Sequence, residues 1–244
     1  MRALRASVLL ATLVVLSPAR GIAYRPFDQT DADVAAPKEF ELELGPVIFQ
    51  HGPEGNAWAP SFVLNLGIVR DLELVVDGNG FVRLGPLPAD ASRWSATSAV
   101  QVKYIVREGS LQDTSGPSVA LEGGVLFPSI PRGSDWGVSL AGLVSQRWEA
   151  ATVHLNLLVE RDLAGAWEFV GGAIIEGPFR WALRPVGEVY VDQSTTGATV
   201  SSFLVGAIWR VSDQVSLDGA VRFEPHSAEA LVEVRLGFTW SFPL

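Results

Sequence analysis

The side chains that could do chemistry in this chain are mostly carboxylates and arginines, and they recur at every second position. Glu41 and Glu43 are separated by one apolar residue, and one valine separates Glu233 from Arg235. Successive residues of a β-strand point to opposite faces, so this spacing gathers the charges on one face of each strand. The charged face predicted in this way comprises Glu41, Glu43, Glu73, Asp77, Lys103, Arg107, Glu122, Arg180, Arg184, Glu188, Arg210, Asp218, Arg222, Glu233 and Arg235.

Patterns for catalysis and metal binding are weak. Of the three histidines, His51 and His226 fall in predicted loops. His154 and Asn156 share one strand face, but hydrolysis by such a pair needs a serine within hydrogen-bond reach, and no His-x-Ser pattern occurs. The chain has no cysteine, and its carboxylates are spread along strands without the spacing of a calcium loop. We therefore expect no enzyme, no metal site and no cofactor.

The first 23 residues have the three-part plan of a secretory signal peptide. Arg2 and Arg5 precede an apolar run over residues 8–16, and the small residue Ala23 stands where cleavage would occur. A transmembrane helix needs about 20 apolar residues, so this run is too short to be a membrane anchor. We expect residues 1–23 to be removed on export.

Composition argues against some partners and favours a membrane. The formal net charge is −9, and loss of the signal peptide would make the chain more acidic. Nucleic acids and anionic membrane surfaces both select basic proteins, so neither is an expected partner. Only 18% of the residues are charged, mean hydropathy is +0.26, and no later apolar stretch could span a membrane as a helix. A transmembrane β-barrel explains this combination, because alternate residues of its strands face lipid.

A period-two pattern begins at residue 38 and continues to the end of the chain, interrupted by clusters of turn-forming residues. It predicts twelve strands, over residues 38–49, 57–69, 72–84, 95–107, 117–127, 135–147, 150–160, 165–176, 179–192, 198–211, 214–224 and 229–242. A tilted strand needs about 9–11 residues to cross a bilayer, and most of these are long enough. Unpaired strand edges are not tolerated in hydrocarbon, so the strands must close. We predict an all-β fold, a closed antiparallel up-and-down transmembrane β-barrel over residues 38–244, preceded by a periplasmic lead-in over residues 24–37.

The last predicted strand shows the two faces most clearly. Apolar side chains alternate from Val232 to Phe242, with Glu233 and Arg235 on the opposite face. The eight tryptophans lie mostly towards strand ends, where an aromatic girdle would meet the membrane interfaces. Ordinary packing of these tryptophans in a core is the alternative.

The predicted connections alternate in length. Short turns such as 70–71 alternate with longer connections such as 85–94, as in transmembrane barrels with short periplasmic turns. Connection 108–116 is an exception, because it is long and yet falls on the side of the short turns. Gly171 and Gly172 are interpreted as strand glycines that permit bulges or curvature.

Four stretches carry a resemblance to a known family. Residues 38–44 (KEFELEL) and 66–74 (LGIVRDLEL) look like the opening hairpins of outer-membrane proteins named phenol-degradation MetA-pathway or putative transporter proteins. Residues 210–219 (RVSDQVSLDG) resemble the penultimate turn of that family, and its closing strand is similar to residues 232–242. The resemblance implies an outer-membrane barrel with a transport role, and it implies no catalytic residues.

The charged face allows two hypotheses about the barrel interior. Early strands contribute acids and later strands contribute most of the basic residues, and closure would place Arg235 near the row from Glu39 to Glu43. In one hypothesis these ladders face each other across a narrow channel and orient polar or zwitterionic solutes. In the other they pair and fill the lumen, since unpaired buried ions cost several kcal/mol. Twelve strands are intermediate between the filled interior of eight and the open water of sixteen, so both hypotheses stay open.

We therefore expect a channel of the bacterial outer membrane that transports small solutes passively, organic or aromatic solutes included. The alternative is a structural or surface-interaction barrel with a plugged lumen, and a third hypothesis is a soluble periplasmic or secreted β-sandwich. Expected partners are outer-membrane lipid, a small-molecule solute and the barrel-assembly machinery, which would recognise the C-terminal strand. Such strands usually end on an aromatic residue, whereas this chain continues past Phe242 with Pro243 and Leu244.

Overall fold

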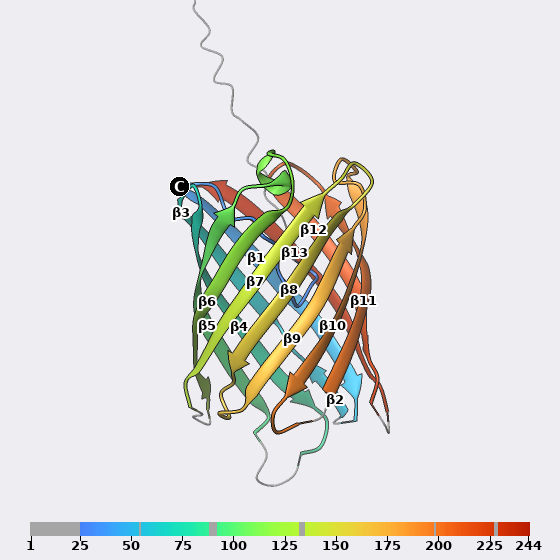
Figure 1. Ribbon diagram of the computed structural model, residues 1–244. Coiled ribbons are helices and arrows are strands. Elements are labelled where there is room, and N and C mark those ends of the chain that lie inside the picture. The colour runs from blue at the N-terminus through green and yellow to red at the C-terminus, as the bar shows by residue number, and fades with distance from the viewer. Residues whose placement is uncertain (1–24, 54, 88–91, 132–134, 198, 227–228) are drawn as a thin grey trace, which may run out of the picture.

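The computed structural model describes residues 25–53, 55–87, 92–131, 135–197, 199–226 and 229–244, and the predicted signal peptide lies outside them. These residues form one antiparallel sheet that closes into a barrel (Figure 1). The strands are β1 (Glu39–Gly52), β2 (Gly55–Trp58), β3 (Ser61–Val69), β4 (Leu72–Leu84), β5 (Trp94–Arg107), β6 (Ser118–Ile130), β7 (Gly137–Arg147), β8 (Thr152–Arg161), β9 (Trp167–Glu176), β10 (Leu183–Ser194), β11 (Thr199–Arg210), β12 (Val215–Glu224) and β13 (Leu231–Pro243).

The barrel closes where the first strand pairs with the last. The β1–β13 ladder runs antiparallel from Glu39 opposite Pro243 to His51 opposite Val232. β2 and β3 both pair with β1 on one side and β4 on the other, and from β4 to β13 each strand pairs with the next, so no strand of the described barrel is left with a free edge. β2 and β3 are two halves of one strand, which makes twelve strands around the barrel. The predicted fold class is confirmed.

One predicted strand, 57–69, is interrupted. β2 pairs with the far half of β1 and β3 with its near half, and the chain between them contains Pro60. Proline has no N–H to donate to a ladder, which explains the break at this position. A bulge in β1 between Leu44 and Val47 lies at the same height, so the sheet is irregular on both sides of this seam.

The two ends of the barrel differ. β1 begins and β13 ends at one end, which we call the terminal end. β4 ends and β5 begins at the opposite end, which we call the loop end (Figure 1). The connection 108–117, predicted to be unusually long for its side, contains the 3-10 helix η1 (Ser110–Gln112) at the terminal end. Among the described residues, no helix is both long and apolar enough to cross a membrane.

Large apolar side chains cover the outside of the barrel. Leu157 in β8 is 72% exposed and Val205 in β11 is 69% exposed. Apolar surface of this extent is unstable in water, so it marks the lipid-facing side. All eight tryptophans are exposed, which excludes the core-packing alternative. Trp58, Trp94, Trp136 and Trp167 lie near the loop end, and Trp148, Trp181, Trp209 and Trp240 lie near the terminal end.

We expect Leu157→Arg to destabilise the folded barrel in lipid vesicles. Leu157 lies in the middle of β8, and a charged side chain on the lipid face costs about 2–4 kcal/mol near the bilayer midplane. Val211→Arg is the control, because Val211 is exposed in the connection between β11 and β12. Urea unfolding of both variants measures the difference, and equal stabilities would contradict a lipid contact at Leu157.

Candidate functional site

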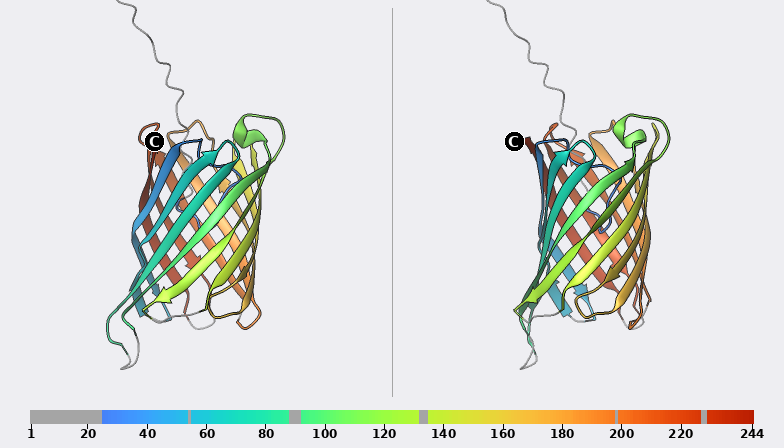
Figure 2. Two further views of the ribbon diagram at one scale, coloured as in Figure 1. Left: turned by 90° about the vertical axis from the view of Figure 1, so that its left-hand side faces the viewer. Right: turned by 60° about the vertical axis from the view of Figure 1, so that its left-hand side comes forward.

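The first described residues of the chain lie inside the barrel. We call residues 25–37 the closing segment, whose trace runs inside the barrel (Figure 2). Its backbone and side chains contact lumen-facing residues of β1, β4, β5, β7, β8, β10, β12 and β13. Residues 25–37 of the lead-in predicted over residues 24–37 therefore lie in the lumen, while residue 24 lies outside the described residues. That the terminal end faces the periplasm stays a prediction.

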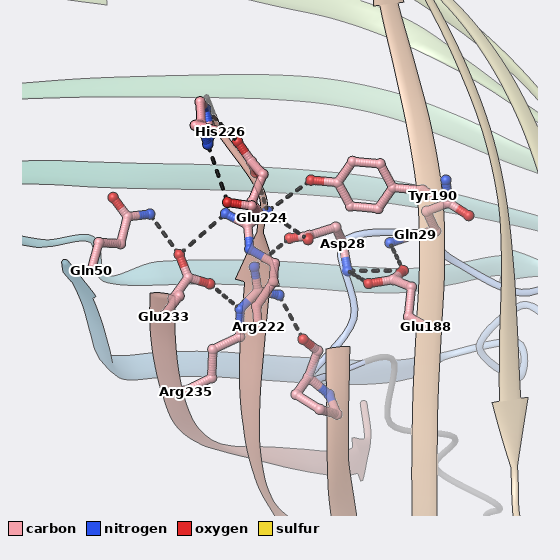
Figure 3. A network of polar contacts seen from close by, with 11 residues as sticks. Asp28, Gln29, Gln50, Glu188, Tyr190, Arg222, Glu224, His226, Glu233 and Arg235 are labelled. Carbon is pink, nitrogen blue, oxygen red and sulfur yellow. Dashed lines mark hydrogen bonds and ion pairs between the residues drawn. The ribbon is translucent and has the colours of Figure 1, made fainter. Parts of the chain in front are cut away.

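Asp28 anchors the closing segment to β12 and β13. One carboxylate oxygen lies 2.6 Å from a guanidinium nitrogen of Arg235, and the other lies 3.0 Å from a guanidinium nitrogen of Arg222 (Figure 3). Burial alone would raise the pKa of the Asp28 carboxyl, but Arg235 and Arg222 hold that pKa below its ordinary value. Asp28 is therefore an ionised carboxylate held by two guanidinium groups of the barrel wall.

The backbone beside Asp28 is held by a wall carboxylate. The N–H groups of Asp28 and Gln29 both donate to Glu188, the latter at 2.9 Å. Arg235 also donates to the carbonyl oxygen of Pro26 at 2.6 Å. The wall thus recognises both the backbone and the side chain of this turn (Figure 3).

Arg25 contacts acids on another part of the wall. Its guanidinium group lies 3.4 Å from Asp218 and donates to the Ser61 hydroxyl at 2.9 Å, while its backbone N–H donates to Glu43 at 3.2 Å. Only two residues separate Arg25 from Asp28. The closing segment therefore presents a positive charge to acids and a negative charge to arginines.

The middle of the closing segment binds β5 and β8. Thr30 exchanges two backbone hydrogen bonds with the Asn156 side chain, and its hydroxyl accepts from Lys103 at 3.1 Å. Lys103 is only 2% exposed and also lies 3.3 Å from Glu73 and 3.5 Å from Glu122. This lysine therefore joins acids from two neighbouring strands to the closing segment.

A serine, a histidine and a glutamate form a chain of hydrogen bonds next to Ala32. The Ser145 hydroxyl lies 2.8 Å from His154 Nδ1, and His154 Nε2 lies 3.1 Å from Glu176. The period-two pattern does not identify this serine, because it lies opposite His154 on the neighbouring strand. The Ser145 hydroxyl is fully buried and accepts the backbone N–H of Ala32 at 3.0 Å. In this arrangement Ser145 holds the closing segment and is shielded from any solute.

The connection 108–117 covers the closing segment at the terminal end. Gln112 of η1 donates to the carbonyl oxygen of Ala32 at 3.0 Å and to the Asp33 side chain at 2.9 Å. The segment then returns to the wall, where the Ala35 N–H donates to Glu73. The unusual length of this connection thus has a structural role, because it closes over the inserted segment.

Glycines of the wall allow the closing segment to approach it closely, and Gly172 and Gly237 are two of them. A Cβ atom at Gly172 would occupy the position of the Gln29 side chain, and one at Gly237 would overlap the guanidinium group of Arg25. Gly171, which we grouped with Gly172 as a strand glycine, has an outward position where a Cβ would make an ordinary contact with Leu157 at 3.6 Å. The inward glycine therefore serves packing of the segment rather than curvature alone.

A cavity of about 760 Å³ lies in the lumen between the closing segment and the loop end. Asp28, Arg222 and Arg235 line one end of it. Its lining also includes Leu163 of the connection 162–166 and Ser95 at the start of β5, both near the loop end. The cavity is thus a vestibule that extends from the loop end and ends on the closing segment.

Most of the predicted charged face surrounds the lumen. Glu41, Glu43, Glu73, Lys103, Glu188, Asp218, Glu233 and Arg235 are buried, and Asp77, Glu122, Arg184 and Arg222 are partly buried. Arg107, Arg180 and Arg210 are instead exposed at the terminal end, where the period-two register stops. Arg107 follows a bulge in β5 and donates to the Pro117 carbonyl oxygen, while Arg180 lies in a connection against the Phe179 ring.

The expected neighbourhood of Arg235 with the acids of β1 is not found. Glu43 lies opposite Thr239, and the bulge in β1 leaves Arg235 opposite Ile48. Arg235 binds Glu233 and Asp28 instead. The positive charge next to Glu43 comes from Arg25 of the closing segment, which the period-two pattern could not identify.

Comparisons with known proteins give the fold. No family model and no curated protein matches this chain. An outer membrane channel from Pseudomonas putida F1 has a TM-score of 0.58 at 13% identity, covering 88% of this chain and 100% of the channel. The NanC porin has a TM-score of 0.59 at 7% identity, with 82% and 98% covered, and the KdgM porin 0.55 at 11%, with 83% and 99% covered. The chain has the fold of outer-membrane channel barrels.

This fold and the exposed apolar belt place the chain in the outer membrane. The similar structures are channels and porins rather than enzymes. Within the described residues, no group of three or more potential ligands is arranged to hold a metal ion.

We expect Gly172→Leu to displace the closing segment, since the new side chain would occupy the space of Gln29. Overpacking of this kind typically costs about 1–3 kcal/mol, which corresponds to roughly tenfold faster local opening. Chymotrypsin cleavage after Phe27, followed by mass spectrometry of the detergent-solubilised protein, measures that opening. Gly171→Leu is the matched control on the lipid side, and equal cleavage rates in the two variants would contradict the packing of Gln29 on Gly172.

Proposed function

We propose that this protein is an outer-membrane channel for small solutes, and that the closing segment must leave its seat for a solute to pass. The observation that carries the proposal is the vestibule, which extends from the loop end and ends on Phe27 to Thr30. A lumen filled only for stability would not need a cavity of about 760 Å³. The obstruction is also a segment outside the barrel strands, so the wall can stay intact when the segment moves.

The channel structures with the same fold support this function at the level of class. For the identity of the solute, the lining of the vestibule favours a small organic molecule with polar groups. Apolar side chains of Leu126, Leu158 and Val170 line the same cavity as the charged residues. The resemblance to the phenol-degradation MetA-pathway proteins is compatible with such a solute. No family model matches the chain, so membership of that family is part of the proposal.

A plugged barrel with a structural or surface-interaction role is the second candidate. The dense contacts of the closing segment favour this candidate. Asp28 forms ion pairs with two arginines, and Thr30 forms two backbone hydrogen bonds with Asn156. Ala32 donates a backbone hydrogen bond to Ser145 and packs in a small apolar cluster of the wall. In this candidate the segment never leaves its seat. The two functions therefore differ in whether movement of one segment changes conduction.

A disulfide between the closing segment and the wall tests the difference. The Ala32 N–H lies 3.0 Å from the Ser145 hydroxyl, and the chain has no cysteine of its own, so Ala32→Cys with Ser145→Cys introduces one defined pair. In planar bilayers we expect the reduced double variant to conduct and the oxidised one to be silent, because a disulfide fixes residues whose Cα atoms are within about 7 Å.

The single variants Ala32→Cys and Ser145→Cys are the controls, and oxidation should leave their conductance unchanged. Identical conductance of the oxidised and reduced double variant would show that solutes bypass the segment. Silence of the wild type, the single variants and both forms of the double variant would favour the plugged barrel.

A further inference from the structure

We propose that Arg222 and Arg235 form a carboxylate-binding site for a small zwitterionic solute, and that Asp28 is the resident carboxylate which the solute displaces. The proposal rests on the proposed function, because the solute must enter the vestibule and meet a segment that can move. It deepens that function by naming the chemistry that the floor of the vestibule recognises.

The site holds a carboxylate that does not belong to the barrel wall. Arg222 lies in β12 and Arg235 in β13, whereas Asp28 lies on the closing segment about two hundred positions away in sequence. Each guanidinium group contacts a different oxygen of the Asp28 carboxylate, and Arg222 also donates to the Tyr190 hydroxyl at 2.7 Å (Figure 3). Two guanidinium groups from separate strands thus define the position and orientation of one carboxylate.

The wall supplies carboxylates of its own to these two arginines, and they stay in place when the closing segment moves. Glu233 lies between them and binds both, and Glu224 lies 3.8 Å from Arg222. Departure of Asp28 leaves these wall carboxylates in place and removes one acceptor from each arginine. The guanidinium N–H groups that donate to Asp28 would then lack that acceptor, and hydrogen bonds between charged groups are the strong ones, so the vacated position favours another carboxylate.

A solute can reach this position without passing the closing segment. Asp28, Tyr190, Arg222, Glu233 and Arg235 all line the vestibule of about 760 Å³. A carboxylate that enters from the loop end therefore meets the two arginines from the side opposite to the chain that carries Asp28. Competition for the same guanidinium groups would then loosen the anchor of the segment.

The other charges of the vestibule favour a solute with a positive group at its far end. Glu160 and Asp192 lie near the loop ends of β8 and β10, and Asp77 lines the same cavity, where it accepts a hydrogen bond from Gln101. Their negative field opposes a simple anion and attracts a cation. Leu126, Leu158 and Val170 offer apolar contacts between these charges. The arrangement fits an amino-carboxylate with an apolar middle.

Calorimetric titration of the detergent-solubilised protein tests the proposal with 4-(aminomethyl)benzoate as the probe. Benzylamine is the matched compound, since it has the same ring and amine and lacks the carboxylate. We expect the first to bind the wild type and the second to bind at least roughly tenfold more weakly, because hydrogen bonds to charged groups contribute about 1.5–3 kcal/mol.

Variants at the site should move the affinity for 4-(aminomethyl)benzoate in opposite directions. Asp28→Asn removes the competing charge and should tighten binding roughly tenfold, whereas Arg222→Gln and Arg235→Gln should each weaken it roughly tenfold or more. Asp33→Asn is the control within the same segment, because Asp33 binds Gln112 instead of the arginine pair, and it should change the affinity less than about twofold. Heat-modifiable gel migration verifies that each variant is folded.

Equal binding of benzylamine, or unchanged affinity in both arginine variants, would overturn the proposal. Equal tightening in Asp28→Asn and Asp33→Asn would overturn it as well, because release of the segment alone would then set the affinity. These outcomes are separate from the channel function. The disulfide between residues 32 and 145 can still switch conduction when the arginine pair binds no carboxylate.

Discussion

The absence of water in the hydrocarbon core governs this structure, because every backbone N–H and C=O group at that depth must find a partner in the protein. The β1–β13 ladder meets this requirement by closing the sheet. Closure has a consequence for the inside, since a barrel of twelve strands is wider than its own side chains can fill. The charged residues that are excluded from the lipid face then line a space that must hold water, a solute or more protein.

The closing segment provides that protein at the terminal end, and it leaves the loop end hollow. This division explains why the two hypotheses for the lumen, an open channel and a packed interior, each describe half of the barrel. Lys103 shows the packed half, because its ammonium group is buried among Glu73, Glu122 and Thr30. A buried ammonium is tolerated only with such partners. Asp77 shows the other half, since it faces the vestibule with Gln101 as its hydrogen-bond partner.

The strands, their two faces and the girdle of tryptophans could be predicted from the sequence because each depends on local alternation. The contacts of the closing segment could not, since Asp28 and Arg222 are 194 positions apart and residues 25–37 have no periodicity. Pairing between neighbouring strands was equally out of reach. Ser145 faces His154 only because of the β7–β8 register, and the β1–β13 register places Arg235 opposite Ile48, away from Glu43. Pro60 was visible in the sequence, and its missing N–H indicated that the strand is interrupted. The prediction of one continuous strand over residues 57–69 gave more weight to the length of the alternating pattern.

The charges of the closing segment match the field of the lumen, and this match determines how the segment can move. Arg25 binds Glu43 and Asp218, while Asp28 binds the arginines, so a shift along the lumen would bring like charges together. Such a shift is opposed by repulsion that is only weakly screened away from water. Departure as a unit avoids the repulsion but leaves charged side chains of both signs without partners. The open state therefore depends on what replaces the segment, and water or a solute with both charges can do so. Closure of the lumen and recognition of its contents are thus linked through the same side chains.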